Sequence, residues 1–582
     1  MNDKISNRSK AIQLQKRIFR TLRNEVRVLL GPPPPSIQKY ERENQIDFKT
    51  KKLSPLTKSE LIQSVCSVDV TFIADFHTFD QSQRTALRII REAWHAAPDA
   101  SWYIGLELIP SQFQQELDNF QSGKLPLDSF HKLISYESEW GFPWRNYLPI
   151  FDWARENRVR LIALNRPKIF FPNSENLELL KRDEWAAGII TDLVEAIRPT
   201  RPKIIVIYGE LHVGTRHLPR SLHQVSKRAL KKPLSWVTIH QNEEKVFWYL
   251  EKHPYELHTP VVRLRKNVFC VLSSPPWIKL QSLVSFLEGD VEWHTSPPKA
   301  PIEEKNEENS SRPEDEERET EDYGAHEPDY LSIFASYGRT IAEFLEIPPP
   351  SYEDLNLFTF SQIDFLNSLE AEKSLSAAEI RLIRFHVKYN QKIYIPKMRI
   401  AYLASPSLNG VAELASMHLL RSRNPWNSLP LKIQNEEDFY RRILEMAFGF
   451  LGSLILNPRR KCDLADDHRR RIKDLRQGEK PAFPHEQSAR TLAMKWIQHS
   501  SSNLESSITR PFRIGIFTPA AKMVGQVLGL KLHRATLAER ISLQEVRSLF
   551  FRMNENSAKD QYLHFFQYVG DVPTPDTKMD HL

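Results

Sequence analysis

Two acid-x-His pairs end apolar runs in the first half of the chain. The run VTFIADFH ends with Asp75 and His77, and the run KIIVIYGELH ends with Glu210 and His212. Positions two apart in extended backbone point to the same face, so each pair places a carboxylate beside an imidazole. Between them in the sequence, the run YIGLEL leaves Glu107 at its own end. The three ends therefore offer three carboxylates and two imidazoles to one site.

This set of donors suits a divalent metal such as Mn, Co or Zn. A metal held in this way lowers the pKa of a bound water, and a spare glutamate can then act as general base in hydrolysis. A single histidine at a strand end is more often a loop residue that makes a hydrogen bond. Because the acid-x-His pair occurs twice, a functional site and a purely structural role for these histidines are equally favoured.

The runs that carry these residues alternate with amphipathic stretches from about residue 68 to 272. The expected strands are 68–73, 102–108, 159–164, 203–208, 236–239 and 245–250, and the expected helices are 81–97, 110–122, 148–156 and 182–197. Alternation of this kind predicts an α/β fold with a mainly parallel sheet, flanking helices and a ligand crevice at the carboxyl ends of the strands. The last two runs and 261–272 lack intervening helices, which predicts an antiparallel edge.

Composition shifts divide the chain into four parts. Residues 1–60 predict a basic amphipathic helix, which ends at the prolines 32–35, and then a Pro-rich linker. Residues 61–298 form the α/β domain, and 299–326 are expected to be an acidic disordered linker, because 301–322 hold eleven acids against three bases. Residues 327–582 show helical apolar spacing, with strand-like runs only at 392–395 and 513–517, and predict a mostly α-helical second domain of unknown role.

The composition excludes several classes of protein. The 582 residues carry 80 Lys+Arg against 73 Asp+Glu, a net charge of +7 that is too small to indicate a nucleic-acid partner. Three scattered cysteines cannot form a disulfide framework, and 18 glycines disfavour Gly-rich phosphate loops. Since no apolar run of eighteen residues and no leader pattern is found, we expect a cytoplasmic protein. The acidic linker leaves the folded parts more basic than +7 implies, which favours an anionic ligand.

An ordered set of motifs over about residues 68–225 resembles the ChaN-like haem-binding uptake family of the Tiki/TraB-type GxxH superfamily. The matching stretches are 74–77 (ADFH), GLELIP with Glu107, 113–125, 147–165, the pair Arg182-Asp183, and 209–212 (GELH). Two departures stand in the first motif, where Ala74 replaces the family's glycine and Asp75 replaces its glutamate.

The resemblance implies that both GxxH segments face one cleft, and it leaves three functions open. The first is a metal-dependent hydrolase, in which Asp75, His77, Glu107 and His212 hold the metal. Glu107 and Glu210 would also take part in catalysis, with Asp75 or Glu210 as ligand or general base. Arg182 would hold an anionic oxygen, and Asp183 would orient an imidazole. The second is a haem-binding protein, with Tyr147 and Tyr208 among the residues that contact the cofactor. The third is an inactive scaffold acting through the helical domain. We expect a small-molecule, peptide or porphyrin ligand and leave a homodimer open.

Overall fold

The computed structural model describes residues 5–49, 53–167, 175–197, 200–252, 260–288, 330–359, 362–371, 375–404, 407–423, 433–498, 511–551 and 557–574. Within these residues the chain divides into two compact units. One comprises Ile18–Val284, and the other comprises Met1–Arg17 with Ser285–Lys578. The segment predicted as an acidic disordered linker lies outside the described residues.

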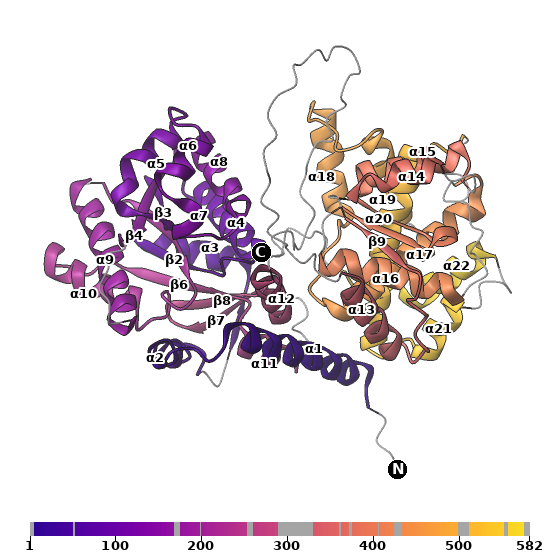
Figure 1. The fold of residues 1–582 in the computed structure, drawn as a ribbon, viewed down its shortest axis with the longest axis horizontal. Coiled ribbons are helices and arrows are strands. Elements are labelled where there is room, and N and C mark those ends of the chain that lie inside the picture. The colour runs from indigo at the N-terminus through magenta and orange to yellow at the C-terminus, as the bar shows by residue number, and fades with distance from the viewer. Residues whose placement is uncertain are drawn as a thin grey trace. The chain divides into compact units, whose positions relative to one another are not determined.

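A mixed eight-stranded sheet forms the centre of the first unit, in the order β1-β7-β8-β6-β2-β5-β3-β4 (Figure 1). The six strands from β8 to β4 in this order run parallel to one another, and β7 pairs antiparallel with both β8 and β1. The strands are β1 (Ser54–Leu56), β2 (Val70–Asp75), β3 (Trp102–Pro110), β4 (Arg160–Asn165), β5 (Lys203–Gly209), β6 (Trp236–Gln241), β7 (Val261–Arg265) and β8 (Val268–Val271). The predicted α/β class, the mainly parallel sheet and the antiparallel strand are confirmed.

Helices cover both faces of this sheet. Side chains alternate along β2, so that Phe72 and Ala74 join the core under α9 and α10, while Ile73 joins the core under α3, α4 and α8. The helices of this unit are α2 (Pro35–Asn44), α3 (Lys58–Ser67), α4 (Asp80–Ala96), α5 (Gln114–Gln121), α6 (Leu127–Leu133), α7 (Tyr136–Glu139), α8 (Leu148–Glu156), α9 (Glu175–Ala196), α10 (Leu218–Leu230) and α11 (Glu244–Glu251). Two further helices, α1 (Asn7–Leu30) and α12 (Pro276–Leu287), contain the unit boundaries.

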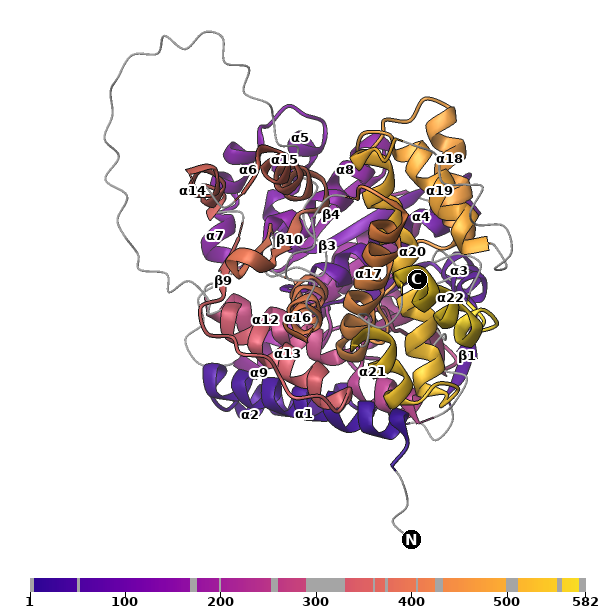
Figure 2. The ribbon, with the colours of Figure 1, turned by 90° about the vertical axis from the view of Figure 1, so that its right-hand side faces the viewer.

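The second unit is mostly helical, as predicted. Its longest helices, α17 (Glu436–Leu456) and α20 (Ile514–Leu537), pack side by side (Figure 2). The other helices are α13 (Tyr330–Phe344), α14 (Phe365–Ala371), α15 (Ala377–Phe385), α16 (Leu408–Arg423), α18 (Ala465–Arg476), α19 (Glu486–Gln498), α21 (Leu543–Phe551) and α22 (Ala558–Val569). A small sheet of β9 (Asn356–Phe358), β10 (Lys392–Ile395) and β11 (Ile400–Leu403) packs on α14 and α15.

Three sequence predictions of local structure are wrong. Residues 245–250, expected as a strand, lie in α11, because their buried side chains recur at helical spacing. Residues 513–517 were also expected as a strand, but α20 begins at Ile514 and buries a helical stripe from Phe517 onward. The prolines do end α1 at Leu30, yet α2 starts at Pro35 instead of an extended linker, since proline fits the first turn of a helix. In the described part of the chain, no helix has the length and apolar character needed to cross a membrane.

Candidate functional site

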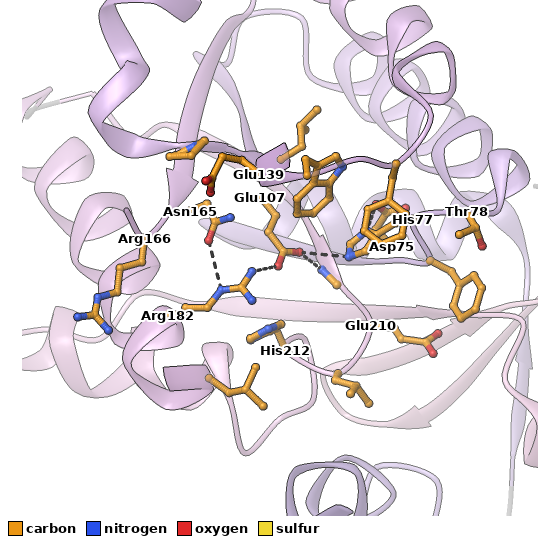
Figure 3. Close-up of a pocket in the computed structure, with 18 of the residues that line it drawn as sticks. Asp75, His77, Thr78, Glu107, Glu139, Asn165, Arg166, Arg182, Glu210 and His212 are labelled. Carbon is orange, nitrogen blue, oxygen red and sulfur yellow. Dashed lines mark hydrogen bonds and ion pairs between the residues drawn. The ribbon is translucent and has the colours of Figure 1, made fainter. Parts of the chain in front are cut away.

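A pocket of about 740 Å³ opens at the carboxyl ends of β2, β3 and β5 (Figure 3). In an open α/β sheet this is the edge where ligands bind, because the loops that follow parallel strands converge there. The pocket is lined by all five residues of the sequence-predicted strand ends, Asp75, His77, Glu107, Glu210 and His212, and by Arg182 of α9. Helix α2, which the sequence did not predict, contributes Ile37 to the same wall.

The first acid-x-His pair forms a carboxylate–imidazole dyad. Asp75 ends β2, and its Oδ2 lies 2.9 Å from Nδ1 of His77. The same oxygen accepts a hydrogen bond of 2.6 Å from the hydroxyl of Tyr147, and Gln83 donates to the other oxygen. Burial disfavours the protonated imidazole, but the hydrogen bond to Asp75 and the charges of Asp75 and Glu107 outweigh it and raise the pKa of His77. His77 therefore tends to carry a proton at the pocket wall.

A second dyad uses a carboxylate that comes from a helix. Oδ1 of Asp183, on α9, lies 2.7 Å from Nδ1 of His212. Tyr40 of α2 donates a hydrogen bond of 2.5 Å to Oδ2 of Asp183, and its ring stacks on His217 at 3.6 Å. Burial, and then the charge of Arg182, lowers the pKa of His212 to about 3. His212 is therefore a neutral imidazole, and its Nδ1 is held by Asp183. Burial raises the pKa of Asp183 to about 8, so a cation bound at Nε2 is needed to favour the ionised Asp183 that accepts the Nδ1 hydrogen and leaves Nε2 as the lone pair.

Glu107 lies between His77 and Arg182 in the pocket. One of its oxygens forms an ion pair with Arg182, and the other accepts a hydrogen bond of 2.5 Å from the amide of Gly209 (Figure 3). That second oxygen also lies 3.9 Å from Nε2 of His77. A Cβ at position 209 would lie 3.1 Å from the Glu107 carboxylate and 3.4 Å from the His77 ring, so the glycine allows this close approach. Arg182 is in turn positioned by Asn165 at the end of β4.

Glu210 does not join His212, although the two stand in the same acid-x-His spacing as Asp75 and His77. Its carboxylate pairs with the ammonium of Lys279 on α12 at 2.8 Å. Strand β5 ends at Gly209 and the chain then turns, so that residues two apart no longer share a face. The carboxylate beside His212 is consequently Asp183, which lies 29 positions earlier in the chain.

Aromatic side chains form the remaining wall. The rings of Trp140 and Phe142 lie 4.5 and 4.8 Å from the ring of His77, centroid to centroid. Nε1 of Trp140 is buried and has no hydrogen-bond partner among the described residues, so it can still donate to a ligand. The two tyrosines predicted to contact a cofactor, Tyr147 and Tyr208, are fully buried behind the dyads. A direct contact between either tyrosine and a ligand stays a prediction.

The fit of a divalent metal can be judged from the oxygens and nitrogens that remain available. Asp75 and Glu107 already use their oxygens in hydrogen bonds and in the ion pair with Arg182. Among the described residues, no three His, Cys, Asp or Glu side chains are grouped so that they could hold a metal ion. The predicted set Asp75, His77, Glu107 and His212 does line one pocket. Metal binding by these four residues stays a prediction.

Comparisons with known proteins support the resemblance seen in the sequence. Residues 61–171 match the model of the family described as haem-binding uptake, Tiki superfamily, ChaN. This segment is ChaN-like. A solved structure titled "Cofacial heme binding to ChaN of Campylobacter jejuni" is 12% identical, with a TM-score of 0.25, and the match covers 34% of this chain and 92% of that one. No curated protein matched the chain.

Two residues that shape this pocket were missed in the sequence analysis. Tyr40 stands in the arm before the matched segment, in a stretch whose prolines favoured a linker. Gln83, one turn into α4, orients Asp75. A helical interpretation of PSIQKYEREN would have placed Tyr40 on a folded element, but nothing in its spacing indicates that it meets a residue 143 positions away.

Proposed function

We propose that the ChaN-like unit binds an iron porphyrin in this pocket and that Nε2 of His212 is the ligand to iron. The observation that carries the proposal is the Asp183–His212 dyad. An imidazole that coordinates a metal must be neutral, and it usually donates its other N–H to a carboxylate or carbonyl that fixes the ring. His212 meets the first condition through its lowered pKa. Asp183 is in position to meet the second, because a cation bound at Nε2 would lower the pKa of Asp183 from about 8 and favour the carboxylate that accepts the Nδ1 hydrogen.

The rest of the pocket matches the other parts of a porphyrin. Trp140 and Phe142 offer the aromatic surface that an apolar macrocycle requires. Arg182 and Arg166 line the same pocket and carry the positive charge that propionates would need. The volume of about 740 Å³ lies within the range of roughly 300–1,000 Å³ that is typical of cofactor pockets. When bound, the iron supplies redox and ligand-binding chemistry, and the chain supplies orientation and charge.

His77 has a different role in this proposal. Because its pKa is raised, His77 keeps its proton to higher pH than an ordinary imidazole does, which makes it a poorer ligand to iron than His212. Held by Asp75 and Tyr147, it presents an N–H to the pocket that can donate to a propionate or to an oxygen ligand. In this proposal His212 coordinates the iron, and His77 donates a hydrogen bond to the ligand.

Hemin titration of the full-length protein tests the proposal. We expect a saturable change of the Soret band with one hemin per chain. The His223→Ala variant, which removes an exposed histidine of α10 outside the pocket, should behave like the wild type. A Soret change that does not saturate, or that is equally large for a protein unfolded in denaturant, would contradict the proposal.

A metal-dependent hydrolase is the second candidate. It is favoured by the contact of 3.9 Å between His77 and Glu107, which brings an imidazole and a carboxylate together beside an arginine. In this case Arg182 would hold the developing anionic oxygen and Glu107 would accept a proton from water. Elemental analysis of protein purified without chelator tests it. Stoichiometric Mn, Co or Zn that is lost in His77→Ala and His212→Ala would favour the hydrolase, and metal-free protein that binds hemin would exclude it.

A further inference from the structure

The helical unit contains a cluster of charged side chains far from the sheet in sequence. Five cations and two carboxylates make up this basic cluster: Lys392, Arg421, Arg442, Arg460, Lys522, Glu413 and Glu445. The two carboxylates are 4% exposed each, and every one of their ion pairs is internal to the cluster. Glu445 is shared by Arg421 and Arg442, and Glu413 is shared by Lys392 and Arg460. Four basic side chains thus surround two acids, and Lys522 is a fifth basic side chain. Burial lowers the pKa of Lys392 well below its usual value and the pKa of Arg460 to about 9, which reduces the positive charge of the basic cluster.

Lys522 has no acidic partner of its own. In the described part of the chain its ammonium contacts only the side-chain oxygen of Asn390, at 3.5 Å. Burial, and then the charges of Arg460 and Arg442, lowers its pKa to about 8. The charge of Asp463 raises this pKa, but Asp463 is itself paired with Arg490 at 2.7 Å. Lys522 is half-buried, and a partly desolvated cation without a counterion among the described residues is costly, so this position favours an anion.

Helix packing explains why Lys522 lies in the cluster. Helices α17 and α20 approach closely at Gly525, where a Cβ would lie 2.6 Å from the carbonyl oxygen of Ile443. Lys522 is one turn before Gly525 on α20, and Arg442 precedes Ile443 on α17. Residues three apart on a helix share a face, so the close approach brings Lys522 toward Arg442.

A buried histidine adds an unused donor to this basic cluster. His386 begins a π-helical turn, His386–Asn390, and is 1% exposed. Lys522 contacts the oxygen of the Asn390 amide, so the amide nitrogen donates to Nδ1 of His386 at 2.7 Å. The hydrogen of the neutral ring is then on Nε2, which has no partner among the described residues. The π-helical turn is a rare form that recurs at functional sites.

We propose that Lys522, His386 and Arg442 bind a phosphate-like oxyanion, either free phosphate or the phosphate group of a monoester. Among the described residues, the Lys522 ammonium on α20 has no acidic partner and Nε2 of His386 on the π-helical turn has no hydrogen-bond partner. Arg442 on α17 is paired with Glu445 and adds its charge beside them. Such convergence of donors around an excess of positive charge suits a tetrahedral dianion, which can accept several charge-assisted hydrogen bonds at once. This site is independent of the pocket in the ChaN-like unit.

Calorimetric titration of the full-length protein with inorganic phosphate tests the site, at constant ionic strength in a buffer free of phosphate and sulfate. We expect saturable binding that weakens at least about tenfold in Lys522→Gln and changes less in Lys522→Arg, which keeps the charge. The control Lys495→Gln removes a lysine from an exposed basic groove around Arg476 and Arg513, and should bind like the wild type. Phosphoserine, titrated in parallel, separates the sources, since tighter binding of the ester would indicate a phosphomonoester.

Thermal unfolding provides the second readout. Because Lys522→Gln removes an uncompensated, half-buried charge, its melting temperature without phosphate should equal or exceed that of the wild type. Phosphate should raise the melting temperature of the wild type and leave the variant unchanged. The proposal is wrong if wild-type protein binds neither phosphate nor phosphoserine, if Lys522→Gln binds phosphate as the wild type does, or if Lys495→Gln is the variant that loses binding.

Discussion

The pocket contains two histidines with the same immediate chemistry and opposite charge behaviour. His77 is held by Asp75, two residues away on the same strand end, and its pKa is raised. His212 is held by Asp183 from a helix, and its pKa is lowered to about 3. The difference follows from burial and from the partners. The hydrogen bond and charge of Asp75 raise the pKa of His77, whereas burial dominates at His212 and raises the pKa of Asp183 itself to about 8, so that Asp183 supplies little negative charge. A carboxylate partner alone therefore does not decide which imidazole is free to coordinate.

Removal of each imidazole is the change with the largest expected effect. We expect His212→Ala to weaken hemin binding by at least about a hundredfold, because it removes the proposed iron ligand. His77→Ala should weaken it less than about tenfold, because only a hydrogen bond is lost. Hemin titration of both variants beside His223→Ala checks this order. A larger loss in His77→Ala would reverse the assignment of the two histidines.

Removal of the carboxylate partners should have the next largest effect. Asp183→Asn keeps the size of the side chain but removes its charge, so we expect hemin affinity to fall about 10- to 100-fold, as is usual for groups that orient a ligand. The matched variant Asp75→Asn should cost less than about tenfold. Equal losses in the two variants would show that the dyads do not differ in role.

Tyr40→Phe gives a smaller effect in the same dyad. The variant removes the hydroxyl that donates to Asp183 but keeps the ring that stacks on His217. We expect a loss of hemin affinity of about three- to tenfold, because the Asp183 carboxylate loses one of its hydrogen bonds. Circular dichroism and the melting temperature, measured on the same samples, show whether the fold is intact. A loss as large as that of His212→Ala would mean that Tyr40 contacts the ligand itself.

Glu210→Gln is expected to have the smallest effect on binding. Glu210 pairs with Lys279 and not with His212, so hemin affinity should stay within about threefold of the wild type. The melting temperature should fall by a few degrees, since the ion pair with a largely buried lysine is lost. A strong loss of hemin binding with an unchanged melting temperature would show that Glu210 takes part in hemin binding.

The two histidine pairs also show how much of the fold and of the site could be predicted from the sequence. The alternation of apolar runs and helices gave the correct sheet class, and the runs ending in Asp75, Glu107 and Gly209 converge on one pocket. The acid-x-His spacing predicted a pair correctly only at Asp75–His77, where the acid is still the last residue of β2. At Glu210–His212 the strand has ended, and a turn cannot be seen from residue types alone.

Contacts between residues far apart in the chain could not be predicted from the sequence, for a different reason. The contact of Tyr40 with Asp183 depends on α2 folding back to the sheet, and a Pro-rich stretch is compatible with either a linker or a helix start. In the helical unit, apolar periodicity located the helices, whereas Lys522 contacts Asn390 at a separation of 132 positions. Side chains that meet only through packing leave no local pattern.

The electron paramagnetic resonance spectrum of the ferric hemin complex at pH 5 tests the central claim most directly. A raised pKa means that His77 is protonated at this pH and cannot coordinate, whereas His212, with a pKa of about 3, remains neutral. We predict that the signal of histidine-ligated iron seen at pH 7 persists at pH 5. Loss of that signal between pH 7 and pH 5, with the protein still folded, would contradict His212 as the ligand.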